Sequence, residues 1–390
     1  MRPSVPARAT IETFHQIDDT PIAACGQPLA TAMLQMTTRP KPPRPASSVN
    51  RATILDVARR AGVSLGTVSN VVNARGNVSA AREARVQTEI AALNYVPNGV
   101  AQSLRRQRSR VVGLCAPLTS SAYFAALLDT FEDLAAAQGY EMMQVLSRQE
   151  PALELRRVSA LIARKVDGLI LIPSHDPFAA FDLVAAAAMP TVVVDRGYDD
   201  RRFDYVTIDD HAAMAAATTA LLSRGHRRLL YVLRYPSLVT TQQRMKSFRE
   251  TAAAVRGAVA EICVREPGEE SFARQIAAIV RRAEAPTAII ASNSDITLAL
   301  LRIFIDLGVA YPRDVSLVAF DAPPWAEVLT PPLSVVAPPV GEIARKTWDL
   351  LRARMEGEGG RRKRIALEAE LIERASLAPP PAPASRRRAA

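Results

Sequence analysis

The amino-acid sequence predicts an α/β protein in which a small all-helical domain precedes two doubly wound parallel-sheet subdomains. The chain has 390 residues, more than one hydrophobic core normally fills. Residues 53–94 have the pattern of three short helices, and from residue 111 onward apolar strands alternate with helix-length segments. Such alternation is typical of parallel sheets covered on both faces, and about 265 residues suit two sheets better than one.

The first predicted helices lie between Thr53 and Asn94. Asp56 falls in the first turn of the first helix, where the helix dipole favours an acid, and Gly62 ends that helix. The predicted caps are Thr53 for a helix over Ile54 to Arg60, Ser64 for Leu65 to Val72, and Ser79 for a helix to about Leu93. Their apolar positions would form one small core: Val57, Ala58, Ala61, Val63, Val68, Val71, Val72, Val86, Ile90 and Leu93.

Strands and helices alternate after residue 110 at the spacing of βαβ units. The predicted strands are Val111 to Ala116, Glu141 to Leu146, Gly168 to Pro173, Thr191 to Asp195, Leu229 to Leu233, Glu261 to Val264, Ala288 to Ser292 and Ser316 to Phe320. The predicted helices between them are Phe124 to Gln138, Leu153 to Arg164, Phe178 to Ala188, His211 to Arg224 and Asp295 to Leu307. Ligands of such folds bind at the carboxyl ends of the strands.

Both ends of the chain differ in composition from the rest. We predict a disordered, basic and proline-rich extension over residues 1–50 and a second disordered tail over 377–390. The net charge is +10, but residues 1–110 hold 15 basic and 6 acidic residues, against 34 and 33 in the rest. A basic segment of this kind favours a polyanionic partner.

Composition excludes several classes of protein. With 48% hydrophobic and 23% charged residues the chain is neither wholly disordered nor fibrous, and no apolar run approaches the roughly 18 residues of a membrane-spanning helix. The first 30 residues show no secretory signal. Three scattered cysteines and four isolated histidines predict neither a disulfide framework nor a metal site. We therefore expect a cytoplasmic protein without a metal or other cofactor.

The segment from Thr53 to Asn73 combines a helix, a glycine turn and a second helix. We expect the second helix to expose a face that carries Ser64, Leu65, Gly66, Thr67, Ser69, Asn70 and Asn73. A recognition helix enters the major groove of DNA in this way, with its first residues at the base edges and nearby hydroxyls and amides on phosphates. An ordinary helical hairpin with solvated polar residues has the same generic pattern.

A more specific match resolves this choice. The sequence resembles the LacI/GalR family of bacterial transcription regulators in the segments Ile54 to Ser64, Thr67 to Asn73, Val78-Ser79 and Leu93 to Asn98. The resemblance implies that Leu65, Gly66 and Asn70 select the base sequence. It also assigns DNA contacts to Thr53, Ile54, Ser64, Thr67, Ser69, Asn73 and Ser79. Because Leu65 and Gly66 cannot make bidentate hydrogen bonds, direct reading would rest on Asn70 and on contact with a thymine methyl group.

The domain over 51–97 is followed by a segment, 98–110, that resembles the hinge helix of this family. The resemblance places a leucine wedge at Leu104 and further DNA contacts at Asn98, Ala101 and Arg105. Apolar wedges kink DNA, and flanking arginines suit the minor groove. A solvated basic linker is the alternative, and Gly99 would weaken an isolated helix by roughly 1 kcal/mol.

Residues 111–376 also resemble the family, whose core is similar to periplasmic sugar-binding proteins. Marker segments include Gly168 to Pro173, Val193 to Arg196, Arg224 to Arg228, Pro286 to Asn293 and Asp314 to Asp321. The resemblance implies two subdomains with a ligand in the cleft between them. We expect one subdomain to comprise roughly 111–208 with 336–365, and the other 209–335 with 366–376.

Position by position, the resemblance places seven side chains in the cleft: Tyr123, Phe124, Asp195, Arg244, Asn293, Asp321 and Trp325. Carboxylates, an amide, a guanidinium fork and aromatic faces suit a polyhydroxylated effector, most simply a sugar or sugar derivative. Each residue has a plainer alternative, since an aspartate after a strand is commonly a helix cap and Phe124 could belong to the core. Ser294 and Ala322 depart from the acidic residues common in the family, so the effector cannot be taken from a relative.

The expected function is a DNA-binding repressor under allosteric control, acting as a homodimer because two half-sites require two recognition helices. The runner-up interpretations are a soluble sugar-binding protein and an α/β enzyme with a DNA-binding appendage. No phosphate loop, Gly-x-Gly-x-x-Gly or Gly-x-Ser-x-Gly motif occurs, which argues against an enzyme. The missing secretory signal and the helix-turn-helix argue against a transported binding protein.

Overall fold

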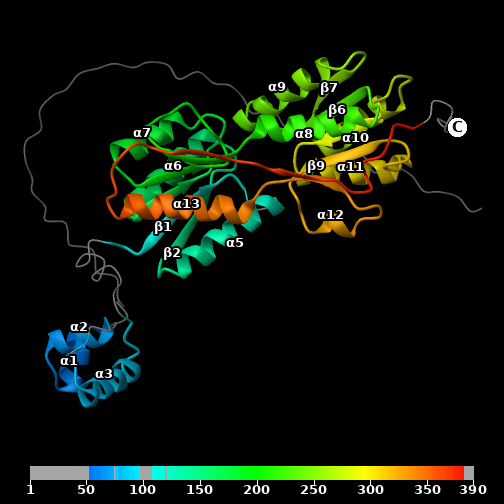
Figure 1. The fold of residues 1–390 in the computed structure, drawn as a ribbon. Helices are drawn as coiled ribbons and strands as arrows, with labels where there is room; N and C mark the ends of the chain where they lie inside the picture. Colours follow the sequence, from blue (N-terminus) through cyan, green and yellow to red (C-terminus); the bar gives the residue numbers. More distant parts are fainter. Residues whose placement is uncertain (1–51, 74–75, 77, 97–107, 119–120, 382–390) are drawn as a thin grey trace, which may run out of the picture. The chain divides into compact units, whose positions relative to one another are not determined.

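The computed structural model describes residues 52–73, 76, 78–96, 108–118 and 121–381. The chain divides into two compact units, one ending at Val96 and the other starting at Pro97 (Figure 1). The expectations for residues 1–50, for 98–107 and for 382–390 lie outside the described residues. Within the described ranges, no helix has the length and apolar character that crossing a membrane requires.

The first unit contains three helices: α1 (Ile54–Ala61), α2 (Leu65–Val72) and α3 (Ala80–Ala92). Thr53 and Asp56 form a reciprocal capping box on α1, and Gly62 ends that helix in the left-handed region with φ of 64°. Ser64 caps α2 by accepting from the amide of Thr67. Ser79 precedes α3 as predicted, but its side chain makes no capping hydrogen bond.

All ten apolar positions predicted for this unit belong to one hydrophobic cluster, so the prediction is confirmed. Val57, Val68 and Val86, one from each helix, are fully buried at its centre. An ion pair between Arg60 and Glu89 (2.8 Å) joins α1 to α3 at the surface. Burial of this small core, rather than the propensity of such short helices, holds the unit together.

The second unit contains two six-stranded sheets. The first has the order β11 (Arg364–Leu367), β5 (Asp204–Ile208), β4 (Thr191–Val194), β3 (Gly168–Leu171), β1 (Val111–Ala116) and β2 (Glu141–Leu146). The second has the order β12 (Glu370–Ile372), β10 (Ser334–Ala337), β9 (Ser316–Phe320), β8 (Ala288–Ala291), β6 (Arg228–Leu233) and β7 (Val259–Val264). Every pairing is parallel except that of β12 with β10. The eight predicted strands are confirmed to within two residues, and β5, β10, β11 and β12 are additional.

Helices cover both faces of each sheet (Figure 1). Those of the first sheet are α5 (Ala122–Ala136), α6 (Pro151–Ala163), α7 (Phe178–Ala186) and α13 (Val340–Met355). Those of the second are α8 (Asp210–Ser223), α9 (Val239–Ala253), α10 (Glu269–Arg281), α11 (Ser294–Leu307) and the short α12 (Trp325–Val328). The five predicted helices are confirmed to within two residues, whereas α9, α10, α12 and α13 were not predicted.

The chain crosses between the two sheets three times, and two of the predicted subdomain boundaries are wrong. The boundary at residue 336 falls inside β10, which pairs with β9 up to Val336. The boundary at 365 falls inside β11, whose four residues all pair with β5. The crossings lie instead at residues 208–210, 337–340 and 367–370. Each sheet with the helices that cover it is called a lobe below, and strand pairing rather than composition decides where a lobe ends.

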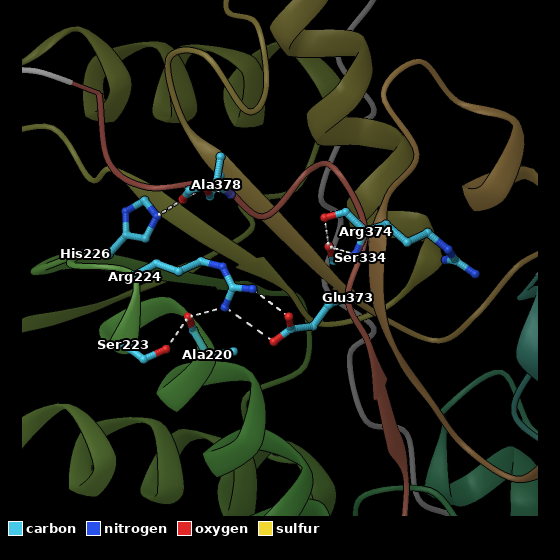
Figure 2. A network of polar contacts seen from close by, with 9 residues as sticks. Ala220, Ser223, Arg224, His226, Ser334, Glu373, Arg374 and Ala378 are labelled. Atoms are coloured by element: carbon cyan, nitrogen blue, oxygen red, sulfur yellow. Dashed lines mark hydrogen bonds and ion pairs between the residues drawn. The ribbon is translucent and has the colours of Figure 1, made fainter.

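Residues 373–381, here called the C-terminal strap, run back over the second sheet. The predicted disordered tail is therefore wrong for 377–381, because Leu377 is buried in the core beside α8. Figure 2 shows His226 donating from Nε2 to the carbonyl of Ala378 (2.8 Å) and Arg224 paired with Glu373 (2.6 Å). Leu377 was not predicted to be buried, because the sequence that follows it is rich in proline.

Candidate functional site

The recognition helix α2 presents its first residues to solvent. Ser64, Leu65 and Gly66 are exposed, and Leu65 retains 39% of its accessible surface. The hydroxyl of Ser64 is shared with Thr67 through a 2.9 Å hydrogen bond and also accepts from the Thr67 amide. The tip of α2 is thus rigidly capped while an apolar side chain and a bare backbone project outward, as contact with a thymine methyl group requires.

Among the other predicted DNA contacts of this unit, Thr53 and Ser79 are exposed and the rest are half-buried. Ser69 and Asn70 are half-buried on α2. Asn73 turns back on the helix, with Nδ2 donating to the carbonyl of Ser69 at 2.5 Å. Thr53 uses its hydroxyl within the capping box of α1, and Ile54 packs against the small core. Asn70 therefore remains the predicted base-reading residue, because its side chain does not cap a helix.

The predicted hinge residues Asn98, Ala101, Leu104 and Arg105 lie outside the described residues. The end of that segment is described, and it is attached to the core. Asp167 accepts hydrogen bonds from the amide and hydroxyl of Ser109 (2.6 and 2.8 Å) and from the amide of Arg110 (2.9 Å). The predicted hinge limit at 110 is therefore too late, because residues 108–110 are already part of the second unit.

A cavity lies between the two sheets, at the carboxyl ends of their strands. It encloses about 780 Å³, including the solvent at its mouth. Six of the seven predicted effector residues line it: Tyr123, Phe124, Asp195, Arg244, Asn293 and Asp321. Trp325 does not line it, and instead packs, half-buried, against the core that α11 covers. The resemblance that suggested Trp325 does not hold at this position, where Trp325 begins the short helix α12.

Asp195 and Asp321 occupy equivalent places in the two sheets. Asp195 directly follows β4 and Asp321 directly follows β9, and each strand is the fourth of its lobe in chain order. Both residues have φ of 71°, a left-handed conformation that costs a residue other than glycine about 1 kcal/mol or more. Both turn a carboxylate into the cavity, one from each lobe. Strain repeated at two matched positions is characteristic of a binding site.

Arg244, on α9, is fixed by three neighbours. Its Nε donates to Asp210 at 2.6 Å, its Nη1 donates to the carbonyl of Ser292 at 3.2 Å, and its guanidinium lies 4.0 Å from the ring centre of Phe320. Asp210 is buried, with 2% of its side chain exposed, and Arg244 retains 13%. One edge of the guanidinium is therefore held by the protein, which leaves Nη2 for a ligand.

Burial raises the pKa of several acidic groups in this site. It raises the pKa of Asp210 to about 6, against the opposing effect of Arg244. It also raises the pKa of Asp321 to about 6, although Arg244 and the amide of Ser294 favour the charged form. The pKa of Tyr123 lies well above its usual value because its hydroxyl is buried beside Asp195. Carboxylates that are costly to ionise gain from hydroxyl groups that replace the lost water.

Asn293 both caps a helix and lines the cavity. Its side-chain oxygen caps α11 by accepting from the amide of Ile296 at 2.9 Å. Its amide nitrogen is the group that can still donate to a ligand. Tyr123 and Phe124 form a tilted aromatic pair, with ring centres 5.1 Å apart, at the start of α5. Phe124 both lines the cavity and belongs to the core of the first lobe.

The sequence reasoning missed several residues of the cavity. Among them are Arg196, Gln149, Arg234, Tyr235 and Asp295. Arg196 could have been predicted from the sequence, because it follows Asp195 in the marker segment at the end of β4. Its Nη1 donates to Gln149 (2.7 Å) and to the carbonyl of Pro173, and its Nε lies 3.5 Å from Asp195. Gln149 comes from a loop whose place in the cavity no local pattern indicates.

Two family profiles match the chain. The profile of bacterial regulatory proteins of the lacI family matches residues 53–98, and that of a periplasmic binding protein-like domain matches 218–377. The chain is 30% identical over 334 residues to the HTH-type transcriptional regulator DegA of Bacillus subtilis, covering 84% of this chain and 99% of the relative. It is 28% identical over 328 residues to the HTH-type transcriptional repressor PurR of Vibrio cholerae, covering 83% and 97%.

Solved structures share the same fold. The lac repressor dimer bound to operator and the anti-inducer ONPF superimposes with a TM-score of 0.74 at 23% identity, over 84% of this chain and 100% of that one. The transcriptional regulator CelR in complex with cellobiose superimposes with a TM-score of 0.62 at 28% identity, again over 84% and 100%. The chain thus shares the fold of these proteins over most of its length.

Proposed function

Because the chain belongs to the lacI family of bacterial regulatory proteins, we propose that it represses transcription by binding an operator through α2. An effector with several hydroxyl groups, a sugar or sugar derivative, controls that binding from the cavity of the second unit. The observation that carries the proposal is the pairing, in one chain, of an exposed, capped recognition helix with a cavity lined by carboxylates from both lobes. The proposal includes no catalytic step and no cofactor, and it places the protein in the cytoplasm.

The roles of individual DNA contacts follow from their chemistry. Asn70 reads a base edge, and Leu65 contacts a thymine methyl group beside the backbone of Gly66. Thr53, Ile54, Ser64, Thr67, Ser69, Asn73 and Ser79 position the unit on the DNA backbone. Leu104 opens a base step in the minor groove, with Asn98, Ala101 and Arg105 beside it.

In the cavity, Asp195 and Asp321 accept hydroxyl protons from the effector, one from each lobe, and Arg244 donates from Nη2. Tyr123 and Phe124 cover the apolar face of a sugar ring, as such aromatic pairs do in carbohydrate sites. Cellobiose in the CelR complex supports this ligand class. Because the two carboxylates sit on different lobes, an effector that bonds both changes how the lobes are spaced, and that change is transmitted to the DNA-binding unit.

A second copy of the chain completes the proposal. Leu298 and Ile305 lie seven residues apart on α11 and are 50% and 80% exposed. Residues at this spacing share one face of a helix, and exposed apolar side chains there suit a symmetric contact between two copies. That the lac repressor is a dimer when bound to its operator supports an assembly of two copies.

A gel-shift experiment tests the proposal. The full chain is expected to retain a DNA fragment from upstream of its own gene, whereas a chain that starts at residue 108 does not. The shortened chain keeps the anchor on Asp167 and therefore is expected to unfold at the same temperature as the full core. A shortened chain that still retains the fragment, or a full chain that does not, contradicts the proposal.

A further inference from the structure

Three arginines line the cavity, and two of them have a carboxylate partner. Arg196 lies 3.5 Å from Asp195, and Arg244 lies 2.6 Å from Asp210. Arg234, the residue after β6, forms no ion pair in the described part of the chain. Its guanidinium is exposed and stacks on the ring of Tyr235, 5.0 Å from the ring centre. Arg234 therefore enters the cavity as a positive charge without a negative partner.

The acids of the cavity do not supply that partner. Asp195 and Asp210 serve Arg196 and Arg244, and Asp321 accepts from the amide of Ser294 at 3.3 Å. Asp295 lies in the first turn of α11, where the positive end of the helix dipole stabilises its charge. Asp295 and Asp321 form no ion pair among the described residues, but both lie at the N-terminus of α11, whereas Arg234 is the one arginine of the cavity lining whose guanidinium has no fixed acceptor there.

We propose that the effector carries an anionic group, a carboxylate or a phosphate, which binds Arg234 beside the ring of Tyr235. This inference rests on the proposed effector site and narrows its ligand to an acidic sugar derivative. A guanidinium presents two parallel donors that fit a carboxylate or phosphate oxygen pair. Arg234 holds the charged end of the ligand, while Asp195, Asp321 and Arg244 take its hydroxyl groups.

Arg265 provides a matched control. It follows β7 as Arg234 follows β6, and the last residues of the two strands, Leu233 and Val264, are paired in register. It also stacks on an aromatic ring, that of Phe272, at 5.1 Å. Unlike Arg234, it does not line the cavity. The two arginines therefore share a strand-end position and an aromatic neighbour, and they differ in that Arg234 is exposed and lines the cavity while Arg265 is half-buried and does not.

The test measures binding of matched probes to the full chain by thermal unfolding and calorimetry. Two series are used: D-glucose, D-gluconate and D-glucose 6-phosphate, and D-ribose, D-ribonate and D-ribose 5-phosphate. At least one charged member is expected to raise the unfolding temperature where its neutral counterpart does not, and which member does so separates carboxylate from phosphate. Arg234→Gln is expected to weaken that binding about 10-fold or more, whereas Arg265→Gln leaves it unchanged.

Three outcomes overturn the inference: stabilisation by neutral sugars as strong as by their charged counterparts, stabilisation by none of the six probes, or equal losses in the two arginine variants. A neutral sugar that alters operator retention in the gel shift removes this inference and leaves the proposed function intact. Failure of the full chain to retain operator DNA contradicts the proposed function, whereas the anionic group of the effector is judged by the binding of the probes.

Discussion

Asp210 positions Arg244 without being part of the cavity lining. It is the first residue of α8, directly after the chain has crossed from the first sheet to the second. The guanidinium that it holds by Nε also contacts the carbonyl of Ser292 and the ring of Phe320. Arg244 is therefore held by a residue that lies at an interlobe crossing.

Replacing Asp210 by Asn is expected to lower the free energy of unfolding by about 2 kcal/mol or more, because it leaves Arg244 buried without its counter-charge. Denaturant unfolding at pH 7.5 measures the loss. The neighbouring variant Asp209→Asn is the control, since Asn still caps α8 as Asp209 does for the amide of Ala212. The double variant Asp210→Asn with Arg244→Gln should cost less than the sum of the single changes. Additive losses would mean that the pair is not coupled.

Asp321 is expected to make the free energy of unfolding fall as pH rises. Its pKa is raised by burial from 3.8 to about 6, so the native chain holds a proton that the unfolded chain releases earlier. Stability contributed by this proton is therefore lost between about pH 4 and pH 6, and Asp321→Asn should flatten the fall in denaturant titrations over that range.

Asp314→Asn is the control for that titration. The pKa of Asp314 is lowered by Arg313, so its contribution is present above about pH 3.8 and is lost only as pH falls further. This variant should leave the slope between about pH 4 and pH 6 unchanged. A slope that is the same in wild type and Asp321→Asn would contradict the assignment.

Elements with a strong local pattern could be predicted from the sequence, and elements held by neighbours could not. The caps at Thr53 and Ser64 and the wholly apolar strands β3, β4 and β8 were visible because residue type alone determines them. The edge strands β11 and β12 are only four and three residues long and contain no fully buried residue, so their pairing with β5 and β10 is what makes them strands. The same holds for the strap, whose order depends on partners more than a hundred residues away.

The strap is expected to stabilise the second lobe. Ending the chain after Ser376 removes buried Leu377 and the acceptor at Ala378, which together contribute about 3 kcal/mol. The unfolding temperature should fall by about 5 °C or more. Ending the chain after Pro381 is the matched control, and it should leave that temperature unchanged. Equal behaviour of the two truncations would show that the strap does not stabilise the lobe.

The same truncation separates the contribution of His226 to the pH dependence. Burial lowers the pKa of His226 from 6.5, and the neutral ring donates from Nε2 to Ala378 while Nδ1 accepts from Thr287. Its stabilising contribution is therefore complete above about pH 6.5 and is lost as pH falls below that value, because the unfolded chain takes up the proton first. The chain that ends after Ser376 should lose less stability between about pH 6.5 and pH 5 than the chain that ends after Pro381.

On the scale of the whole molecule, the sequence predicted the place of the cavity better than it predicted which residues line it. The resemblance predicted six residues that line the cavity, and two of them, Asp195 and Asp321, directly follow strands, at whose carboxyl ends doubly wound sheets bind ligands. Arg234 and Tyr235 directly follow β6 but belong to no recognised motif, and Gln149 lies in a loop whose place at the cavity no local pattern indicates, so all three were missed. Trp325 was wrongly included because a sequence position cannot tell a residue at the cavity from one packed behind it.

The distribution of charge predicts how the protein responds to salt. Residues 111–360 hold 26 basic and 30 acidic residues, so their net charge gives the core no affinity for DNA, while the basic excess lies in the segments before residue 111 and at the C-terminus. Each phosphate contact adds about 0.9 to the slope of the logarithm of affinity against that of salt concentration. Deleting residues 1–50, which hold 5 basic and 3 acidic residues, should therefore flatten this slope and weaken binding to random DNA. Operator preference over random DNA should survive, because α2 supplies it, and fluorescence anisotropy at several salt concentrations measures both. Loss of that preference in the shortened chain would place sequence reading in the extension instead of the helix-turn-helix.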